Sequence, residues 1–348
     1  MILAALSMPL LPSLNATATG PMQTAPTFTS YTAWQNYMAK VPTPQTGCFV
    51  ANYPSVTWQS SQCAAPPPGT ETVGNGVDWV AQAPAGKTIG TSRGSFSTAG
   101  LTTETDKCVA PFLGICGGVA GGKGPHYFGL QINSNFGGGS FPVTYFGNSV
   151  PGGGWEQFVF LSRGPFLNCP TALCGLVWIE FWLFGYFTAH AACPPAAQDP
   201  GPGVGWFASG GNCVFNAFGA LTPARYGTDL GLLNFWGEAT PTFDIGLICY
   251  ITTCYATGDH AYLGLYKHWT DSEFNVVGYI NGSRAEFNLG TRIDVENLLF
   301  DQKGNLIAPA CLKTGYTGET NNLNLSYCLA IVPPGYTSIG AIAFTERN

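Results

Sequence analysis

The chain has 348 residues, of which 45% are hydrophobic and only 9% are charged. Charged residues usually make up about a quarter of a globular protein, so the surface must be polar but largely uncharged, which would suit an acidic medium. A formal net charge of −6 with 13 Lys and Arg residues provides no basic surface for nucleic acid or anionic membranes. We therefore exclude both as partners.

In chain order, residues 1–45 are predicted to lie outside the folded domain. Residues 1–14 are mostly apolar but have no basic start and contain two prolines, as in an atypical export signal. Residues 15–45 are rich in Thr, Ala, Pro and Gln, and we expect an extended arm or a removable leader there. The later apolar run 176–187 is too short to span a bilayer. We expect a secreted protein.

Residues 46–348 are predicted to form one all-β sandwich domain, with under about a tenth of the chain helical. Short strand-forming runs alternate with clusters of Gly, Pro and Asn, and no segment has a helical period. The clearest predicted strands are 128–132, 158–161, 177–187, 246–252, 261–266, 273–280, 285–289, 292–296 and 339–344.

The cysteines predict a disulfide framework. There are 12, none in a Cys-x-x-Cys motif, which disfavours zinc and favours an oxidising compartment. Pairing of sequence neighbours would give 48–63, 108–116, 169–174, 193–213, 249–254 and 311–328, although spacing alone does not prove connectivity. The four histidines lack ligand spacing, so we expect no metal and no other cofactor.

Asn281-Gly282, between the predicted strands 273–280 and 285–289, is typical of a two-residue hairpin turn, because both turn residues need positive φ. Folding about this turn would pair Gly278 with Ala285, Val276 with Phe287 and Phe274 with Leu289, all on a core face. The opposite face would carry Glu273, Asn275, Val277 and Tyr279. That face is either exposed to solvent, as is common in antiparallel sheets, or part of a substrate groove.

Glu180 lies in an otherwise apolar strand. Alternation places it on one face with Trp178 and Trp182, opposite Ile179 and Phe181. A carboxylate in such surroundings is either hydrogen-bonded within the sheet or functional. Together with Glu273 it could line a cleft walled by aromatic rings.

Gln157 is a third candidate, at the entry to another strand, with Glu156 alternating away from it. One apparent motif is rejected. Gly90-Thr91-Ser92-Arg93-Gly94 matches a nucleophile elbow, but no helix is predicted after it.

Five segments resemble, in the same order, those of the secreted glutamic peptidases of the eqolisin type. That family has a Trp-Val-Gly-Ile-Asp-Gly segment, a catalytic glutamine entering a strand, a Trp-Tyr-Glu-Trp strand, an Ala-Glu-Trp-Ile-Val-Glu strand with the catalytic glutamate, and Phe-Ala-Asn-Phe-Gly. The matching residues here are 127–133, Gln157, 178–182, 272–277 and 285–290. Gln131 or Asn133 stands in place of the family's aspartate.

The resemblance implies a concanavalin-like sandwich of two curved antiparallel sheets and an acid-acting endopeptidase with a polypeptide substrate. Glu273 would be the general base and Gln157 the oxyanion stabiliser. Glu180, Trp178, Trp182, Asn275 and Tyr279 would line the substrate groove.

Two alternatives remain open. Paired glutamates beside tryptophans also suit a β-glycanase acting on a polysaccharide, with carboxyl groups about 5–5.5 Å apart in a retaining enzyme. The chain could also be a secreted carbohydrate-binding or structural sandwich with no catalytic role.

Overall fold

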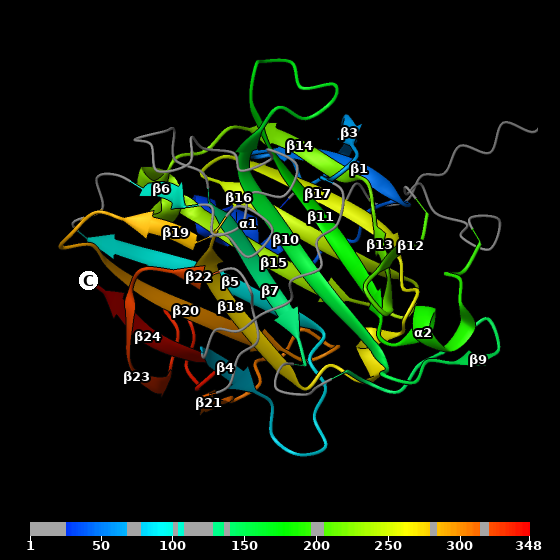
Figure 1. The fold of residues 1–348 in the computed structure, drawn as a ribbon. Coiled ribbons are helices and arrows are strands. Elements are labelled where there is room, and N and C mark those ends of the chain that lie inside the picture. Colours follow the sequence, from blue (N-terminus) through cyan, green and yellow to red (C-terminus); the bar gives the residue numbers. More distant parts are fainter. Residues whose placement is uncertain are drawn as a thin grey trace, which may run out of the picture.

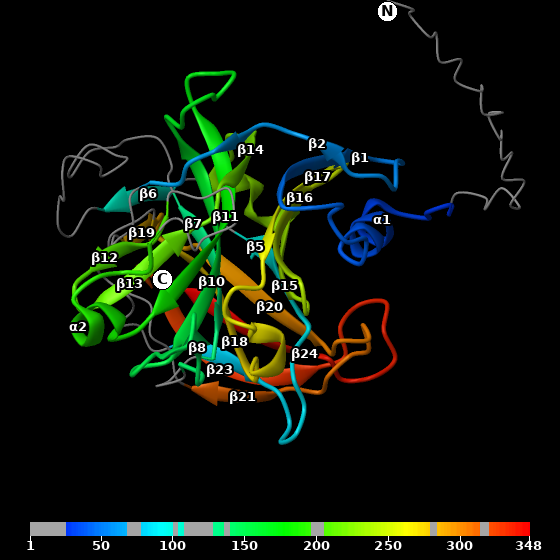
Figure 2. The same cartoon turned by 90° about the vertical axis from the view of Figure 1, so that its right-hand side faces the viewer.

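A computed structural model describes residues 26–67, 78–99, 104–107, 128–135, 140–195, 205–278, 284–313 and 320–348. Strands account for 51% and helices for 9% of the structure. Two large antiparallel sheets, called sheet A and sheet B below, pack face to face (Figures 1 and 2). The predicted all-β sandwich is therefore confirmed.

Sheet A has nine strands. In spatial order they are β2 (Gln59–Ser60), β1 (Gly47–Asn52), β17 (Thr253–His260), β16 (Phe243–Tyr250), β15 (Leu233–Ala239), β5 (Thr91–Ala99), β20 (Arg292–Phe300), β24 (Ala341–Arg347) and β23 (Asn324–Ile331).

Sheet B has ten strands. The main path is β12 (Phe207–Ser209), β13 (Asn212–Asn216), β11 (Cys174–Leu183), β10 (Gly154–Gly164), β7 (Gly129–Ser134), β18 (Asp271–Val277), β4 (Trp79–Gln82) and β21 (Ala310–Lys313), and β14 (Gly219–Pro223) joins β11 to β3 (Cys63–Ala64). The smaller elements are the sheet β22 (Thr320–Asn321), β19 (Arg284–Phe287) and β6 (Glu104–Lys107), the pair β8 (Thr144–Tyr145) and β9 (Asn148–Ser149), and the short helices α2 (Tyr186–His190), η2 (Gly227–Leu232) and η3 (Leu265–Lys267).

Large apolar side chains from both sheets fill the space between them. Phe158 of β10 and Phe274 of β18 are fully buried there. Each lies over a glycine of sheet A, since a Cβ atom at Gly237 would overlap the Phe158 ring and one at Gly94 would overlap the Phe274 ring. These two glycines let the sheets approach closely.

Five of the predicted disulfides are present: Cys48–Cys63, Cys169–Cys174, Cys193–Cys213, Cys249–Cys254 and Cys311–Cys328. The predicted Cys108–Cys116 pair lies outside the described residues. These crosslinks indicate an oxidising environment. Among the described residues, no helix has the length and apolar character needed to cross a membrane.

The prediction of an extended arm up to residue 45 is wrong for its last part. Tyr31–Met38 form helix α1, and the Ser30 hydroxyl caps it by accepting from the Ala33 amide at 3.1 Å. Trp34 and Met38, one helical turn apart, are fully buried against the face of sheet A that is turned away from sheet B (Figure 2). Two apolar anchors suffice for so short a helix, and they leave little periodicity to detect.

The predicted hairpin is also wrong. Strand β18 pairs with β7 on one edge and, through residues 271–273, with β4 on the other. Strand β19 pairs with β6 and β22 instead of β18. Leu289, expected in the core, is 88% exposed. The Asn281-Gly282 turn and Tyr279 lie outside the described residues. The predicted strand 261–266 is replaced by a turn leading into η3.

Candidate functional site

Five polar residues form a row across sheet B. In spatial order they are Glu273 (β18), Asn133 (β7), Gln157 (β10), Glu180 (β11) and Asn216 (β13), and each is directly opposed to the next in the strand register. Directly opposed residues of an antiparallel pair project from the same face. We call this set the polar row.

The polar row lies on the face of sheet B turned away from sheet A. Phe274, Phe158 and Ile179, each one position along from a member of the row, are buried in the core between the sheets. Because side chains alternate along a strand, their neighbours Glu273, Gln157 and Glu180 project the other way. The alternation predicted for these strands is thus correct.

Tryptophans border the row on both sides. Trp182 is opposed to Trp155, and Trp178 lies on the other side of Glu180. The Trp182 Nε1–H donates to Glu180 Oε1 at 2.6 Å. This bond fixes the Glu180 carboxylate against an aromatic wall.

Asn133 connects to Glu273 within the row. Its Nδ2 donates to Glu273 Oε2 at 2.8 Å and, more weakly, to Gln131 Oε1 at 3.4 Å. The Asn133 Oδ1 is buried and accepts no hydrogen bond from the described residues. The Gln157 side-chain amide likewise makes no hydrogen bond to any described residue.

Asn133 separates Glu273 from Gln157 in the row. Their strands flank β7, and at about 4.8 Å per strand interval their Cα atoms are about 10 Å apart. Both side chains are one methylene longer than Asn133, which lies between them. The two longer side chains therefore stand on either side of Asn133.

The row is buried in this structure: Glu273 is 1% exposed, Gln157 6% and Glu180 8%. A substrate would reach these groups only after the face is uncovered. Burial strengthens electrostatic interactions within the row, because the local dielectric constant is lower than in water.

The structure thus brings five of the predicted site residues onto one face: Glu273, Gln157, Glu180, Trp178 and Trp182. Asn275 belongs to the adjacent row, opposite Gln131, but its amide is bound to two other carboxyl groups. Asn133 and Asn216 were not predicted as members. Their signal was a polar residue at the alternate position of an otherwise apolar strand.

Asn275 bridges one buried carboxyl pair. Its Nδ2 donates to Asp78 Oδ2 and, at 2.9 Å, to Glu346 Oε1 of sheet A. Burial raises the pKa of Asp78 to about 6. Burial, together with the nearby Asp78, raises the pKa of Glu346 to about 8. These carboxyl groups are therefore protonated in acid.

A second buried pair, Glu156 of β10 and Asp244 of β16, spans the two sheets. Both side chains are completely buried. Burial raises the pKa of Glu156 to about 8 and, reinforced by Glu156, raises that of Asp244 well above its ordinary value. Neither carboxyl group makes a well-formed hydrogen bond to a described residue, although Asp244 and the Leu265 amide lie near enough to Glu156 to offset part of the rise in its pKa. Burial therefore keeps both carboxyl groups protonated and uncharged at acidic pH.

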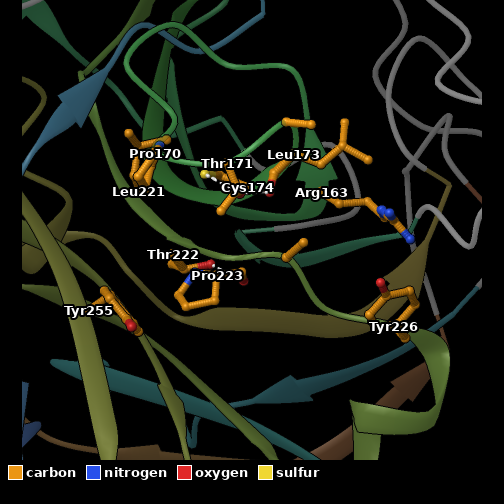
Figure 3. A pocket seen from close by; sticks show the side chains of 12 residues that line it. Arg163, Pro170, Thr171, Leu173, Cys174, Leu221, Thr222, Pro223, Tyr226 and Tyr255 are labelled. Carbon is orange, nitrogen blue, oxygen red and sulfur yellow. Dashed lines mark hydrogen bonds between the residues drawn. The ribbon is translucent and has the colours of Figure 1, made fainter.

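A pocket of about 590 Å³ lies elsewhere, between β14 and the loop that joins β10 to β11. Figure 3 shows Arg163 and Tyr226 at one end and Tyr255 at the other, and the Arg163 guanidinium carbon is 4.7 Å from the centroid of the Tyr226 ring. Arg163 is six residues along β10 from Gln157, or about 20 Å. None of the predicted site residues lines this pocket.

The rejected nucleophile-elbow motif is a plain strand segment. Ser92 lies within β5 and is fully buried. Its hydroxyl donates to Asn297 Oδ1 at 2.8 Å and accepts from the Ser272 hydroxyl at 2.8 Å. It is a structural residue of the core.

Comparison of the chain with family models, with curated proteins and with solved structures finds no match. The function must therefore be argued from the site itself.

Proposed function

We propose that this chain is a secreted, acid-acting glutamic endopeptidase in which Glu273 is the general base and Gln157 stabilises the oxyanion. The observation that supports it most is the register of sheet B, in which both residues belong to one row on strands that flank β7. The order of segments that resembles the eqolisin-type peptidases supports the same assignment, and the five disulfides are consistent with secretion.

In the proposed reaction, a water held between Glu273 and Gln157 attacks the scissile carbonyl carbon. The Glu273 carboxylate takes one proton from the water as the oxygen–carbon bond forms. The electron pair of the carbonyl moves to its oxygen, which accepts a hydrogen bond from Gln157 Nε2–H. Collapse of this intermediate breaks the carbon–nitrogen bond, and Glu273 returns the proton to the leaving amine.

The base must be ionised to accept the proton. An ordinary or mildly perturbed carboxyl group titrates between about pH 2 and 5, and a base works best when its pKa is close to the working pH. The acidic optimum is what the resemblance to the acid-acting peptidases implies. The aromatic wall of Trp178 and Trp182 beside Glu180 would line the groove that receives the substrate.

The glycanase alternative fits the geometry less well. Glu180 and Glu273 are three strand intervals apart, which is about 14 Å between Cα atoms, and Asn133 and Gln157 stand between them. A retaining pair needs carboxyl groups about 5–5.5 Å apart and an inverting pair about 6.5–9.5 Å.

One observation favours the non-catalytic alternative. Glu273 is 1% exposed and hydrogen-bonded to Asn133, as expected of a structural polar network inside a protein. An activity assay separates this interpretation from the peptidase.

The test is cleavage of a reduced and alkylated, unfolded protein by the full chain between pH 2 and 5. We expect cleavage that resists chelators and serine or cysteine reagents, and a turnover about 10²–10³-fold lower in Gln157→Ala with little change in KM. Cleavage of β-glucan but not of peptide would favour the glycanase. Cleavage of neither would favour a binding or structural module.

A further inference from the structure

Asn133 stands between the two residues proposed to carry the reaction and is directly opposed to both Glu273 and Gln157. Its Nδ2 donates to Glu273 Oε2 at 2.8 Å. An ionised carboxylate can only accept hydrogen bonds, so the amide nitrogen must face Glu273. The orientation of the Asn133 amide is therefore fixed, and its carbonyl oxygen Oδ1 faces away from that carboxylate.

The Asn133 Oδ1 is a buried acceptor without a hydrogen-bond donor in the described part of the chain. Leaving such a group unsatisfied destabilises the folded protein, and an unsatisfied group in a native protein calls for an explanation. On the neighbouring strand, the Gln157 amide also has no hydrogen bond to any described residue. An unused acceptor and an unused donor thus lie side by side on neighbouring strands, next to Glu273.

We propose that Asn133 Oδ1 binds the nucleophilic water, a role that rests on the proposed peptidase function. The water would donate one proton to the Glu273 carboxylate and the other to Asn133 Oδ1. A lone pair of the water oxygen is then directed at the scissile carbonyl carbon, whose oxygen accepts from Gln157 Nε2–H. Asn133 gains and loses no proton in this step, and the proton that leaves the water goes to Glu273.

An amide can hold the water at this position without carrying a charge of its own. A second ionised carboxyl group next to Glu273 would compete for its proton, since like charges at short range disfavour joint ionisation. Asn133 is neutral at every pH and still offers both a donor for Glu273 and an acceptor for the water. It therefore orients the water and leaves Glu273 as the sole base.

The test variant is Asn133→Leu, which keeps the approximate shape and removes both hydrogen-bonding groups. We expect kcat to fall about 10²-fold, as for a misplaced reacting group, with KM nearly unchanged because the water contact is used in the chemical step. The matched control is Asn234→Leu in β15 of sheet A, outside the row, which should leave both constants unchanged.

A second readout does not depend on activity. In protein labelled with ¹³C at the glutamate carboxyl groups, the Glu273 signal is identified by its loss in Glu273→Gln. Its titration midpoint should move up by about one pH unit or more in Asn133→Leu, because a hydrogen bond to the ionised form is lost. If Asn133→Leu does not fold, Asn133→Ser, which is too short to reach Glu273 Oε2, carries the same expectations.

The outcomes are distinguishable. A wild-type chain that cleaves no peptide overturns the peptidase proposal itself. An active wild type whose kcat and Glu273 titration are both unchanged by Asn133→Leu overturns the role of Asn133 alone. A fall in kcat without a shift in the Glu273 titration, or with an equal fall in Asn234→Leu, also contradicts it.

Discussion

The buried pair Glu156 and Asp244 predicts that the sandwich is less stable at alkaline than at acidic pH. The unfolded chain releases the Glu156 proton near its ordinary pKa of 4.5, whereas the folded chain holds it up to about pH 8. Below pH 4.5 the folded and the unfolded chain both hold the Glu156 proton, so this group does not lower the free energy of unfolding there. Between these values the unfolded state alone loses the proton, so the free energy of unfolding falls as pH rises.

The size of the effect follows from the shift. The pKa of Glu156 rises from 4.5 to about 8 on folding. At about 1.4 kcal/mol per pH unit, the free energy of unfolding therefore falls by about 5 kcal/mol for one proton. This figure is for Glu156 alone, and the raised pKa of Asp244 acts in the same direction. Domains are stable by only about 5–15 kcal/mol in total, so this loss is a large fraction. The Asp78 and Glu346 pair acts in the same direction.

The assay is urea unfolding of the disulfide-intact protein, followed by tryptophan fluorescence between pH 4 and 8.5. Wild type should lose stability steadily over this range. Glu156→Gln, which removes one titrating group, should lose about 5 kcal/mol less. Glu286→Gln in β19, outside both pairs, should follow wild type. Parallel curves for wild type and Glu156→Gln would refute the reasoning.

Two further predictions concern packing. Gly94→Ala should destabilise the protein by about 1–3 kcal/mol in thermal unfolding, because the added Cβ overlaps the Phe274 ring. The control Gly246→Ala, whose Cβ would have its nearest contact at 3.4 Å, should destabilise far less. Equal effects would contradict the close approach of the sheets at Gly94. Trp34→Ala should lower the free energy of unfolding in urea by about 3–5 kcal/mol. Tyr37→Ala, at a residue that is 40% exposed, should lower it little. A loss below about 1 kcal/mol for Trp34→Ala would mean that α1 is not integral to the fold.

Local patterns predicted some features of this molecule well. Alternation along single strands placed Glu180 with Trp178 and Trp182 and put Phe274 in the core, because the period of a strand does not depend on its partners. Pairing of neighbouring cysteines was correct for the five described disulfides, since the loops they close are short.

Features that depend on long-range strand pairing could not be predicted in this way. The Asn281-Gly282 signal predicts a turn, but it does not show that β19 finds its partners in β6 and β22 rather than in β18. The polar row arises from four separate strand registers, none of which is encoded in a single segment. Glu156 and Asp244 meet only because the two sheets pack, although Asp244 within an apolar strand was a usable signal.

The measurement that tests the central claim most directly is the initial rate of cleavage of an unfolded protein at pH 3 by wild type and by Glu273→Gln. The matched control is Glu238→Gln in β15, because burial raises the Glu238 pKa to about 7 and the residue is neutral at pH 3, as glutamine is. We predict that wild type and Glu238→Gln cleave at the same rate and that Glu273→Gln, folded as judged by its urea unfolding curve, is about 10²–10⁴-fold slower or inactive. Undiminished cleavage by folded Glu273→Gln would contradict the account.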